Sequence, residues 1–266
     1  MISRLPGLSL PERAWGVVRR WALAWWRILY LGAVVCVLVL SPSSYGKVTR
    51  RALARHLYLD TAPVLLGFTV LAALISLVLT RIVIVTAISY GLSRYALEMV
   101  IRVLVLELIP LTAALFVAMR CTIPNGTQLA LLRQSGHLAR LSHAGADPIR
   151  VELLPRAVAG VFACITLAAL SCVVALVLAY LGVYGFSLAG LPSYTRMFGH
   201  VFAPAVTLVF VIKTVLFSLA VALIPMAAGL HDTGERTQPD SELGGLARMF
   251  AVLLLIEIGS LVGNYY

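Results

Sequence analysis

Several apolar runs in this chain are each long enough to cross a lipid bilayer as a helix. The hydrocarbon core of a bilayer is about 30 Å thick, which takes about 20 residues of α-helix. Runs at 61–88, 99–119, 153–182 and 201–230 meet this length, and a shorter run at 246–263 is also sufficient. The chain is 61% hydrophobic and 12% charged, whereas soluble domains are about half apolar and a quarter charged. We predict an all-α integral membrane protein with five transmembrane helices.

The run Ile28–Leu40 is too short for a comfortable crossing, and basic residues flank it on both sides. Arg13, Arg19, Arg20 and Arg27 precede it, and Lys47, Arg50, Arg51 and Arg55 follow it. If the run crossed, one of these groups would lie outside, against the tendency of Lys and Arg to stay on the cytoplasmic side. We therefore expect residues 1–56 to form a cytoplasmic, membrane-embedded start. It comprises an interfacial amphipathic helix, with Trp15, Trp21, Trp25 and Trp26, and then a re-entrant half-helix.

The distribution of basic residues also predicts the orientation of the membrane-spanning domain, residues 57–266. With the N-terminus in the cytoplasm, the spans alternate so that the loop 122–150 is cytoplasmic and the C-terminus is external. That loop and its flanks then carry five basic residues, Arg120, Arg133, Arg140, Arg150 and Arg156. The external loop around 184–199 carries one, Arg196. The reverse orientation would invert this ratio.

The cytoplasmic loop contains an amphipathic pattern over Thr127–Ser142. The leucines Leu129, Leu132, Leu138 and Leu141 recur at helical spacing, while Arg133, Gln134, His137 and Arg140 occupy the remaining surface. Such spacing predicts a helix on or near the membrane. Asp147-Pro148 then marks the start of another helix, because Asp caps free backbone N–H groups and Pro suits the first turn. The helix is either an ordinary solvated surface helix or a coupling helix that docks onto a cytoplasmic partner.

Motifs from Glu107 onward resemble those of the MlaE/YrbE family of permeases. The matching segments are Leu106-Glu107-Leu108-Ile109-Pro110, Ala118-Met119-Arg120, Gln128-Leu129-Ala130-Leu131-Leu132-Arg133, Asp147-Pro148-Ile149-Arg150, Pro155-Arg156-Ala157-Val158-Ala159 and, later, Ile212-Lys213-Thr214-Val215-Leu216-Phe217. The register runs without a gap over about 50 residues, from Glu107 to Gly160. The short basic N-terminal start also fits this family.

The chain departs from the family pattern in the coupling loop. Two glutamates of the pattern fall at Gln128 and Gly136, so both charges are absent, and the following glutamine falls at His137. The glycine of the first motif falls at Ile109. If those acids contact an ATPase, docking is altered in this protein, through either a matching ATPase or a heteromeric pair of permeases.

The resemblance implies a specific assembly in the bacterial inner membrane. Permeases of this type dimerise, bind ATPase subunits in the cytoplasm and lie beneath a periplasmic lipid-binding protein with MCE domains. Together they move phospholipid or related lipid between the inner membrane and the periplasm. The chain itself has no phosphate-binding G-x-x-x-x-G-K-[ST] loop. We therefore expect no cofactor and no enzymatic activity here, with ATP and Mg bound by the partner subunit. The predicted coupling residues are Gln128, Leu129, Leu132, Arg133, His137, Leu138, Arg140, Leu141 and Asp147.

Three charged residues lie within the apolar runs: Glu107, Lys213 and Glu257. An ionised group at the centre of a bilayer costs roughly 2.5–3.5 kcal/mol or more, so such groups pair or face a wet cavity. Glu107 and Lys213 have opposite signs, and both fall at family positions. We expect them to face the interior of the dimer, where they either form a structural ion pair or hold a lipid headgroup.

Two other classes of function are alternatives to a lipid-transport permease. The three intramembrane charges would also suit an ion relay in an ATP-independent secondary transporter or channel, although broken helices and internal repeats are not evident. An intramembrane enzyme is disfavoured because the sequence has no G-x-S-x-G and no Cys/His pairing that suggests a nucleophile. The histidines His56, His137, His143, His200 and His231 form no H-x-x-x-H pair, so we expect no metal site.

Overall fold

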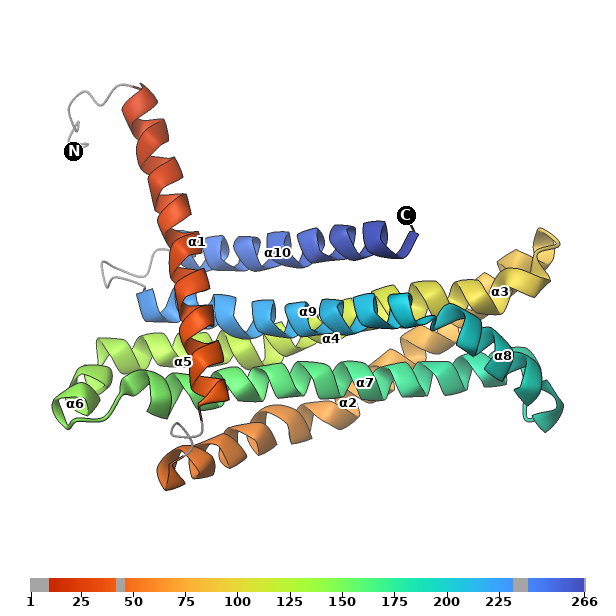
Figure 1. Cartoon of the computed structure of the whole chain (residues 1–266), viewed down its shortest axis with the longest axis horizontal. Coiled ribbons are helices and arrows are strands. Elements are labelled where there is room, and N and C mark those ends of the chain that lie inside the picture. Colours follow the sequence, from red (N-terminus) through yellow and green to blue (C-terminus); the bar gives the residue numbers. More distant parts are fainter. Residues whose placement is uncertain (1–9, 42–45, 232–238, 266) are drawn as a thin grey trace.

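The computed structural model describes residues 10–41, 46–231 and 239–265, and these ranges are helical with no strand. Figure 1 shows α2, α4, α7, α9 and α10 running along one common axis, with α1 lying across them. The α-helices are α1 Leu10–Leu40, α2 Lys47–Ser89, α3 Ser93–Val100, α4 Ile109–Val117, α5 Ile123–Gln134, α6 His137–His143, α7 Leu154–Tyr184, α8 Leu191–Val201, α9 Pro204–His231 and α10 Pro239–Tyr265. Three π-helical segments, η2 Ile101–Leu108, η3 Ala118–Thr122 and η4 Ile149–Leu153, and the 3₁₀ turn η5 Leu188–Gly190 complete the described chain.

Four of the five predicted spans fall within long apolar helices, and the fifth, 201–230, begins three residues before its helix α9. The corresponding segments are Thr49–Ser89, Tyr95–Gln134, Ile149–Tyr184, Pro204–Leu230 and Gly244–Asn264. Each is long enough and apolar enough to cross a membrane, as is a sixth segment in α1, Ala22–Leu40. The protein is therefore an all-α, multi-pass membrane protein.

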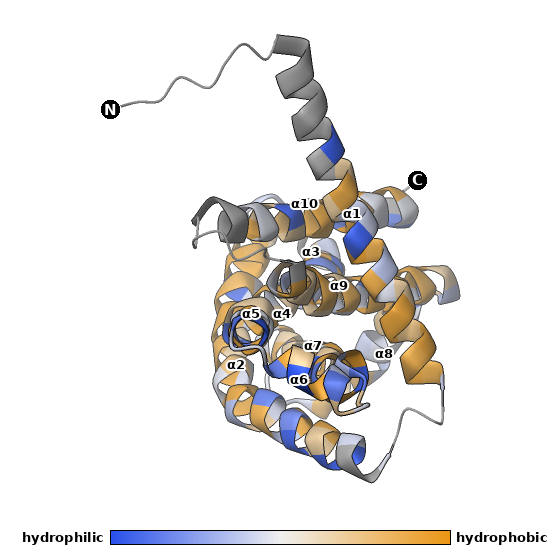
Figure 2. Ribbon diagram, turned by 90° about the vertical axis from the view of Figure 1, so that its left-hand side faces the viewer, coloured by the Kyte–Doolittle hydropathy of each residue, from blue (hydrophilic) through white to orange (hydrophobic). Residues whose placement is uncertain are grey.

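The N-terminal helix α1 differs in detail from the sequence prediction. An interfacial helix followed by a separate half-helix was expected, but Leu10–Leu40 is one continuous helix of 31 residues. No proline lies between Pro11 and Pro42 to interrupt it. In both views α1 runs crosswise to the bundle axis (Figures 1 and 2) and packs on α9 and α7. The side chains of Trp15 and Trp21, expected at the interface, lie outside the described residues, whereas Trp26 is exposed.

The loops between spans are more helical than the sequence predicts. The amphipathic helix expected over Thr127–Ser142 is two helices, α5 and α6, separated at Gly136. Gly136 has a φ of 70°, a left-handed conformation that glycine adopts at little cost and that ends a helix. Moreover, α5 continues the second span through η3 without a break. The external loop expected around 184–199 is largely occupied by η5 and α8.

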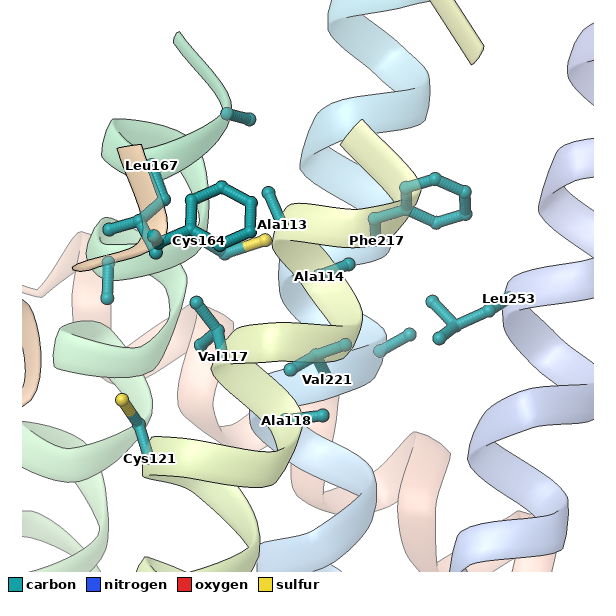
Figure 3. Packing of buried hydrophobic residues seen from close by; sticks show 14 of the residues in the cluster. Ala113, Ala114, Val117, Ala118, Cys121, Cys164, Leu167, Phe217, Val221 and Leu253 are labelled. Carbon is teal, nitrogen blue, oxygen red and sulfur yellow. The ribbon is translucent and has the colours of Figure 1, made fainter. Parts of the chain in front are cut away.

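The bundle core contains many small residues. Figure 3 shows Ala113, Ala114 and Ala118 of the α4–η3 segment between α7 and α9. Phe217 of α9 and Leu253 of α10 lie on the side away from α7 (Figure 3). Small side chains let helix backbones approach closely, which is how helices associate in membranes where the hydrophobic effect between them is weak.

The outward faces of the long helices are apolar. Leu66 of α2 is 76% exposed and Leu255 of α10 is 73% exposed. Figure 2, seen along the bundle, shows that hydrophilic residues gather mainly at the near end, on α5, α6 and the start of α2. A surface of this kind is stable only against lipid or another apolar protein face.

Each π-helical segment lies just before a proline. Pro110 follows η2, Pro124 follows η3 and Pro155 follows η4. Proline has no N–H to donate and clashes with the carbonyl four residues earlier, so the preceding turn widens. These prolines thus leave backbone carbonyls without their usual helical partners inside the bundle, where other donors can reach them.

Candidate functional site: an intramembrane charge cluster and the α5–α6 segment

The structure brings the three predicted intramembrane charges into one cluster. Glu107 comes from η2, Lys213 from α9 and Glu257 from α10. Lys213 Nζ forms an ion pair with the Glu107 carboxylate, and lies 2.8 Å from Oε2 of Glu257. Asn264 of α10 adds a hydrogen bond from Nδ2 to Glu107 Oε1, 3.3 Å long. We refer to Glu107, Lys213, Glu257 and Asn264 as the charge cluster.

The widened turn before Pro110 gives Lys213 a further acceptor. The carbonyl of Leu106 lies four residues before Pro110, so its usual helical donor is missing. Lys213 Nζ donates to this oxygen over 3.2 Å, and the ammonium also lies 5.7 Å from the centroid of the Phe217 ring. With these partners, a lysine that is only 2% exposed can remain charged.

The cluster carries two acids for one base, so its formal charge is −1 when all three groups are ionised. The carboxylates keep some exposure, with side chains 12% and 15% accessible against 1% for Lys213. The acidic side of the cluster is therefore the side that a ligand or a water molecule can reach. The residues also tie α10 to η2 and α9, since α10 packs chiefly on α9.

The predicted coupling residues lie on α5, α6 and the turn before η4, at the opposite end of the bundle from α8 (Figure 1). Leu129 is fully buried, and Leu132, Leu138 and Leu141 are partly buried. Gln128, Arg133, Arg140 and Asp147 are exposed, and His137 is partly buried. The leucine face thus packs inward as the spacing predicts, and the polar face points away from the core.

Hydrogen bonds fix the polar ends of this segment. Arg133 donates through Nη1 to the carbonyl of Leu230 at the end of α9. Arg140 donates to the carbonyl of Ser135 over 3.2 Å. The Asp147 carboxylate accepts the N–H of Ile149 at 3.0 Å, which caps the next helical segment as predicted.

A second polar group, which the sequence interpretation missed, anchors the same end of the bundle. Glu152 accepts a 2.5 Å ion-pair contact from Arg156 and lies 3.7 Å from Nε2 of His137. Asp60 of α2 accepts a 3.0 Å hydrogen bond from the amide of Asn125 on α5. The contacts of Glu152 join α6 to α7 through η4, and the Asp60–Asn125 hydrogen bond joins α2 to α5.

Arg156 is a buried arginine near the start of α7. Its position near a helix end suggests snorkelling to lipid headgroups, but the residue is only 7% exposed. Its Nη1 donates to both the backbone and the carboxylate of Glu152, four residues earlier. The i, i+4 spacing of Glu152 and Arg156 is the sequence signal that indicates this pair. No comparable signal links Asp60 and Asn125, which are 65 residues apart.

Two glycines set how closely α5 and α9 approach. A Cβ atom on Gly126 would lie 2.7 Å from the carbonyl oxygen of Pro225, and one on Gly229 would lie 2.2 Å from the oxygen of Gly126. Real Cβ atoms do not approach so closely, so both positions need glycine as packed here. The α5 helix is therefore held directly against the α9 helix that carries Lys213.

Comparison with known protein families supports the resemblance seen in the sequence. Residues 53–261 match the family described as permease MlaE, and this match covers α7 and α9, most of α2 and α10, the charge cluster apart from Asn264, and α5–α6, but not α1. The chain belongs to the MlaE permease family. No curated protein shows a significant match to it. As an MlaE-family permease, the protein is a transporter component rather than an enzyme, and the family's setting is lipid transport.

Proposed function

We propose that this MlaE-family permease is the membrane subunit of an ABC transporter. It moves phospholipid or a related lipid between the bacterial inner membrane and a periplasmic MCE-domain partner. A separate ATPase subunit binds ATP and Mg and drives the movement, and a second permease copy, identical or related, completes the complex. The observation that carries this proposal is the family match over 53–261, which includes both the buried charge cluster and the α5–α6 segment.

The α5–α6 segment supports a docking role on the cytoplasmic side. Its leucine face is seated on the bundle, so Gln128, Arg133 and Arg140 are left exposed toward a partner. The link from Arg133 to Leu230, and the close approach of Gly126 to Pro225, connect α5 to α9. A displacement of α5 by the ATPase would therefore be transmitted to α9 and to Lys213.

An apolar groove along the η2–α4 segment, whose η2 part carries Glu107, supports a lipid ligand. It has a volume of about 200 Å³ and lies between α2 and the η2–α4 segment. Phe68, Ile75, Leu108 and Phe116 are among its lining residues, and Leu108 follows Glu107 directly in the chain. We propose that acyl chains contact such apolar walls while the charge cluster faces the headgroup.

Copurification and transport measurements test the function as a whole. The tagged permease, purified in mild detergent, is expected to retain an ATPase subunit, an MCE-domain protein and lipid, all detectable by mass spectrometry. The complex in proteoliposomes is expected to move fluorescent phospholipid only with ATP, and vanadate should stop it. Transport by the permease alone, insensitive to vanadate, would instead support the secondary-transporter alternative in which Glu107, Lys213 and Glu257 relay ions.

The variant Lys213→Met tests the role of the charge cluster. If the cluster holds a headgroup, the assembled complex with this variant should lose most lipid transport. Because the two carboxylates lose their cation, assembly is checked by gel filtration, and Lys213→Arg serves as the control that keeps the charge. A stable, assembled and fully active Lys213→Met complex would rule out a headgroup role.

A further inference from the structure

A second cavity lies far from the charge cluster, at the end of the bundle that holds α5. It has a volume of about 240 Å³, is partly open to the outside and is lined by residues of α1, α5, α9 and α10. Its wall is mostly apolar, with Ala24 and Ile28 from α1, Ala130 from α5 and Met249 from α10 among the lining residues. Since α1 lies across the bundle (Figure 1), the cavity forms where this helix covers the junction of α5, α9 and α10.

Two arginines from different helices line this otherwise apolar cavity, Arg27 of α1 and Arg248 of α10. No carboxylate is found among the described residues that line it. The Nε atom of Arg248 is buried with no hydrogen-bond partner in the described part of the chain. Neither arginine belongs to an ion pair between described residues.

Arg248 is partly buried and Arg27 is exposed, and two guanidinium groups on one mostly apolar cavity favour an anion as their shared partner. Like charges repel more strongly in surroundings of low dielectric constant, and a buried N–H without an acceptor is costly. A phosphate group satisfies both demands, because guanidinium forks bind phosphate oxygens with two parallel hydrogen bonds. The charge of the cavity therefore identifies the polar part of its ligand.

The apolar wall identifies the rest of the ligand. A free phosphate would leave the partly exposed Ala24, Ile28 and Leu246 facing water, whereas an acyl chain would cover them. The neighbouring Trp26 is 70% exposed, as suits an indole at the membrane interface where phospholipid headgroups lie. We infer that the cavity between α1, α5, α9 and α10 binds a phospholipid of the adjacent leaflet, with its phosphate held by Arg27 and Arg248. This site is separate from the charge cluster and does not depend on the proposed transport function.

Such a lipid would connect helices that come from distant parts of the sequence. It would bridge the crosswise α1 to α10 and touch Gly126, Thr127 and Ala130 on α5. Occupancy would then stabilise α1 on the bundle and hold α5 in place. The site is therefore expected to contribute to the stability of the whole complex in the membrane.

Binding measurements on the purified permease test the inference. Native mass spectrometry follows titration with dioleoylphosphatidylglycerol, with dioleoylglycerol, which lacks the phosphate, and with inorganic phosphate, which lacks the chains. We expect tight binding of the phospholipid alone. The double variant Arg27→Gln/Arg248→Gln should weaken it by at least about tenfold, because two charge-assisted contacts are lost. The matched control Arg51→Gln/Arg120→Gln removes two exposed arginines outside the cavity and should change binding by less than about twofold.

A cavity-filling variant keeps the test valid if the double arginine variant fails to fold. Ala130→Phe retains both charges but occupies the space of the acyl chain, so phospholipid binding should again fall. A photoactivatable phosphatidylglycerol should crosslink to peptides of α1 and α10. Unchanged phospholipid binding in both cavity variants would overturn the inference. Equal weakening in the matched control, or equally tight binding of inorganic phosphate, would overturn it as well.

Discussion

At the residue scale, the buried Lys213 of this permease lies where a backbone carbonyl oxygen can accept a hydrogen bond from its ammonium group. Lys213 donates a hydrogen bond to the carbonyl of Leu106. This carbonyl is available because Pro110 has no backbone N–H to donate to it. A buried ion pair by itself is weak evidence for stability, since desolvation offsets much of the attraction. The added backbone acceptor and the Asn264 amide reduce that penalty, because each supplies a hydrogen bond that the buried groups would otherwise lose with their water.

The Glu152–Arg156 pair gives a prediction at this scale. Replacing Arg156 with Met leaves the partly buried Glu152 carboxylate without its cation. We expect a loss of roughly 2–3 kcal/mol in the free energy of unfolding, below the value for a fully buried pair because Glu152 keeps some exposure. The measurement is thermal or denaturant unfolding of the detergent-solubilised permease.

The control for this prediction is Arg150→Met. Arg150 pairs with Asp147 at 3.5 Å, and both side chains are about half exposed, so this change should alter stability by less than about 0.5 kcal/mol. Adding Glu152→Gln to Arg156→Met should recover part of the loss. Equal effects of Arg150→Met and Arg156→Met would mean that burial of the pair is unimportant.

At the scale of elements, the crossing of α5 and α9 depends on two glycines. Gly126→Ala places a methyl group 2.7 Å from the Pro225 carbonyl oxygen, so the helices must separate. Overpacking of this kind costs about 1–3 kcal/mol. We expect Gly126→Ala to lower the unfolding temperature and, in the assembled complex, to weaken coupling of ATP hydrolysis to lipid movement.

Gly67→Ala is the matched control for the glycine substitution. Gly67 lies within α2, and a methyl group there would meet no neighbouring atom within 4 Å, so alanine should be neutral or stabilise the helix by up to about 1 kcal/mol. If Gly126→Ala is as stable and as active as Gly67→Ala, the close packing of α5 on α9 is not needed for folding or coupling.

At the scale of the whole molecule, the direction of α1 distinguishes it from the five other apolar helices. It is long enough to cross a membrane, yet it lies across the bundle axis (Figure 2). If the bundle axis follows the membrane normal, α1 lies in the membrane plane. We therefore expect cysteines at Arg19 and Gly46, which flank its apolar part, to be labelled from the same side of the membrane.

That labelling experiment uses a background in which the exposed Cys36 is replaced by Ser. Impermeant maleimide is applied to intact spheroplasts and to inverted vesicles. Labelling of Arg19→Cys and Gly46→Cys from opposite sides would show that α1 crosses the membrane, as its length permits.

The same assay tests the proposed orientation. Cysteines at Arg133 and Arg140, on α5 and α6, should react only from the cytoplasmic side, and one at the exposed Thr195 of α8 only from the periplasm. Reaction of Arg133→Cys from the periplasm would invert the topology and exclude docking of a cytoplasmic ATPase on α5–α6.

The sequence alone determined the class of protein, because apolar runs of more than about 20 residues leave a chain few alternatives to membrane helices. Helical spacing also predicted which leucines of α5 and α6 face inward, and the motifs around Glu107 and Lys213 indicated the family that the match over 53–261 then established. These features depend on local patterns, which a single sequence contains in full.

Only the tertiary structure decided which distant residues meet. The contacts of Lys213 with Glu107 and Glu257, of Asn125 with Asp60, and the shared cavity of Arg27 and Arg248 depend on how the helices cross. The direction of α1 and the break at Gly136 were likewise settled by packing and backbone conformation. A helical pattern fixes which face of a helix is apolar, but it does not fix which other helix covers that face, because many pairings bury similar area.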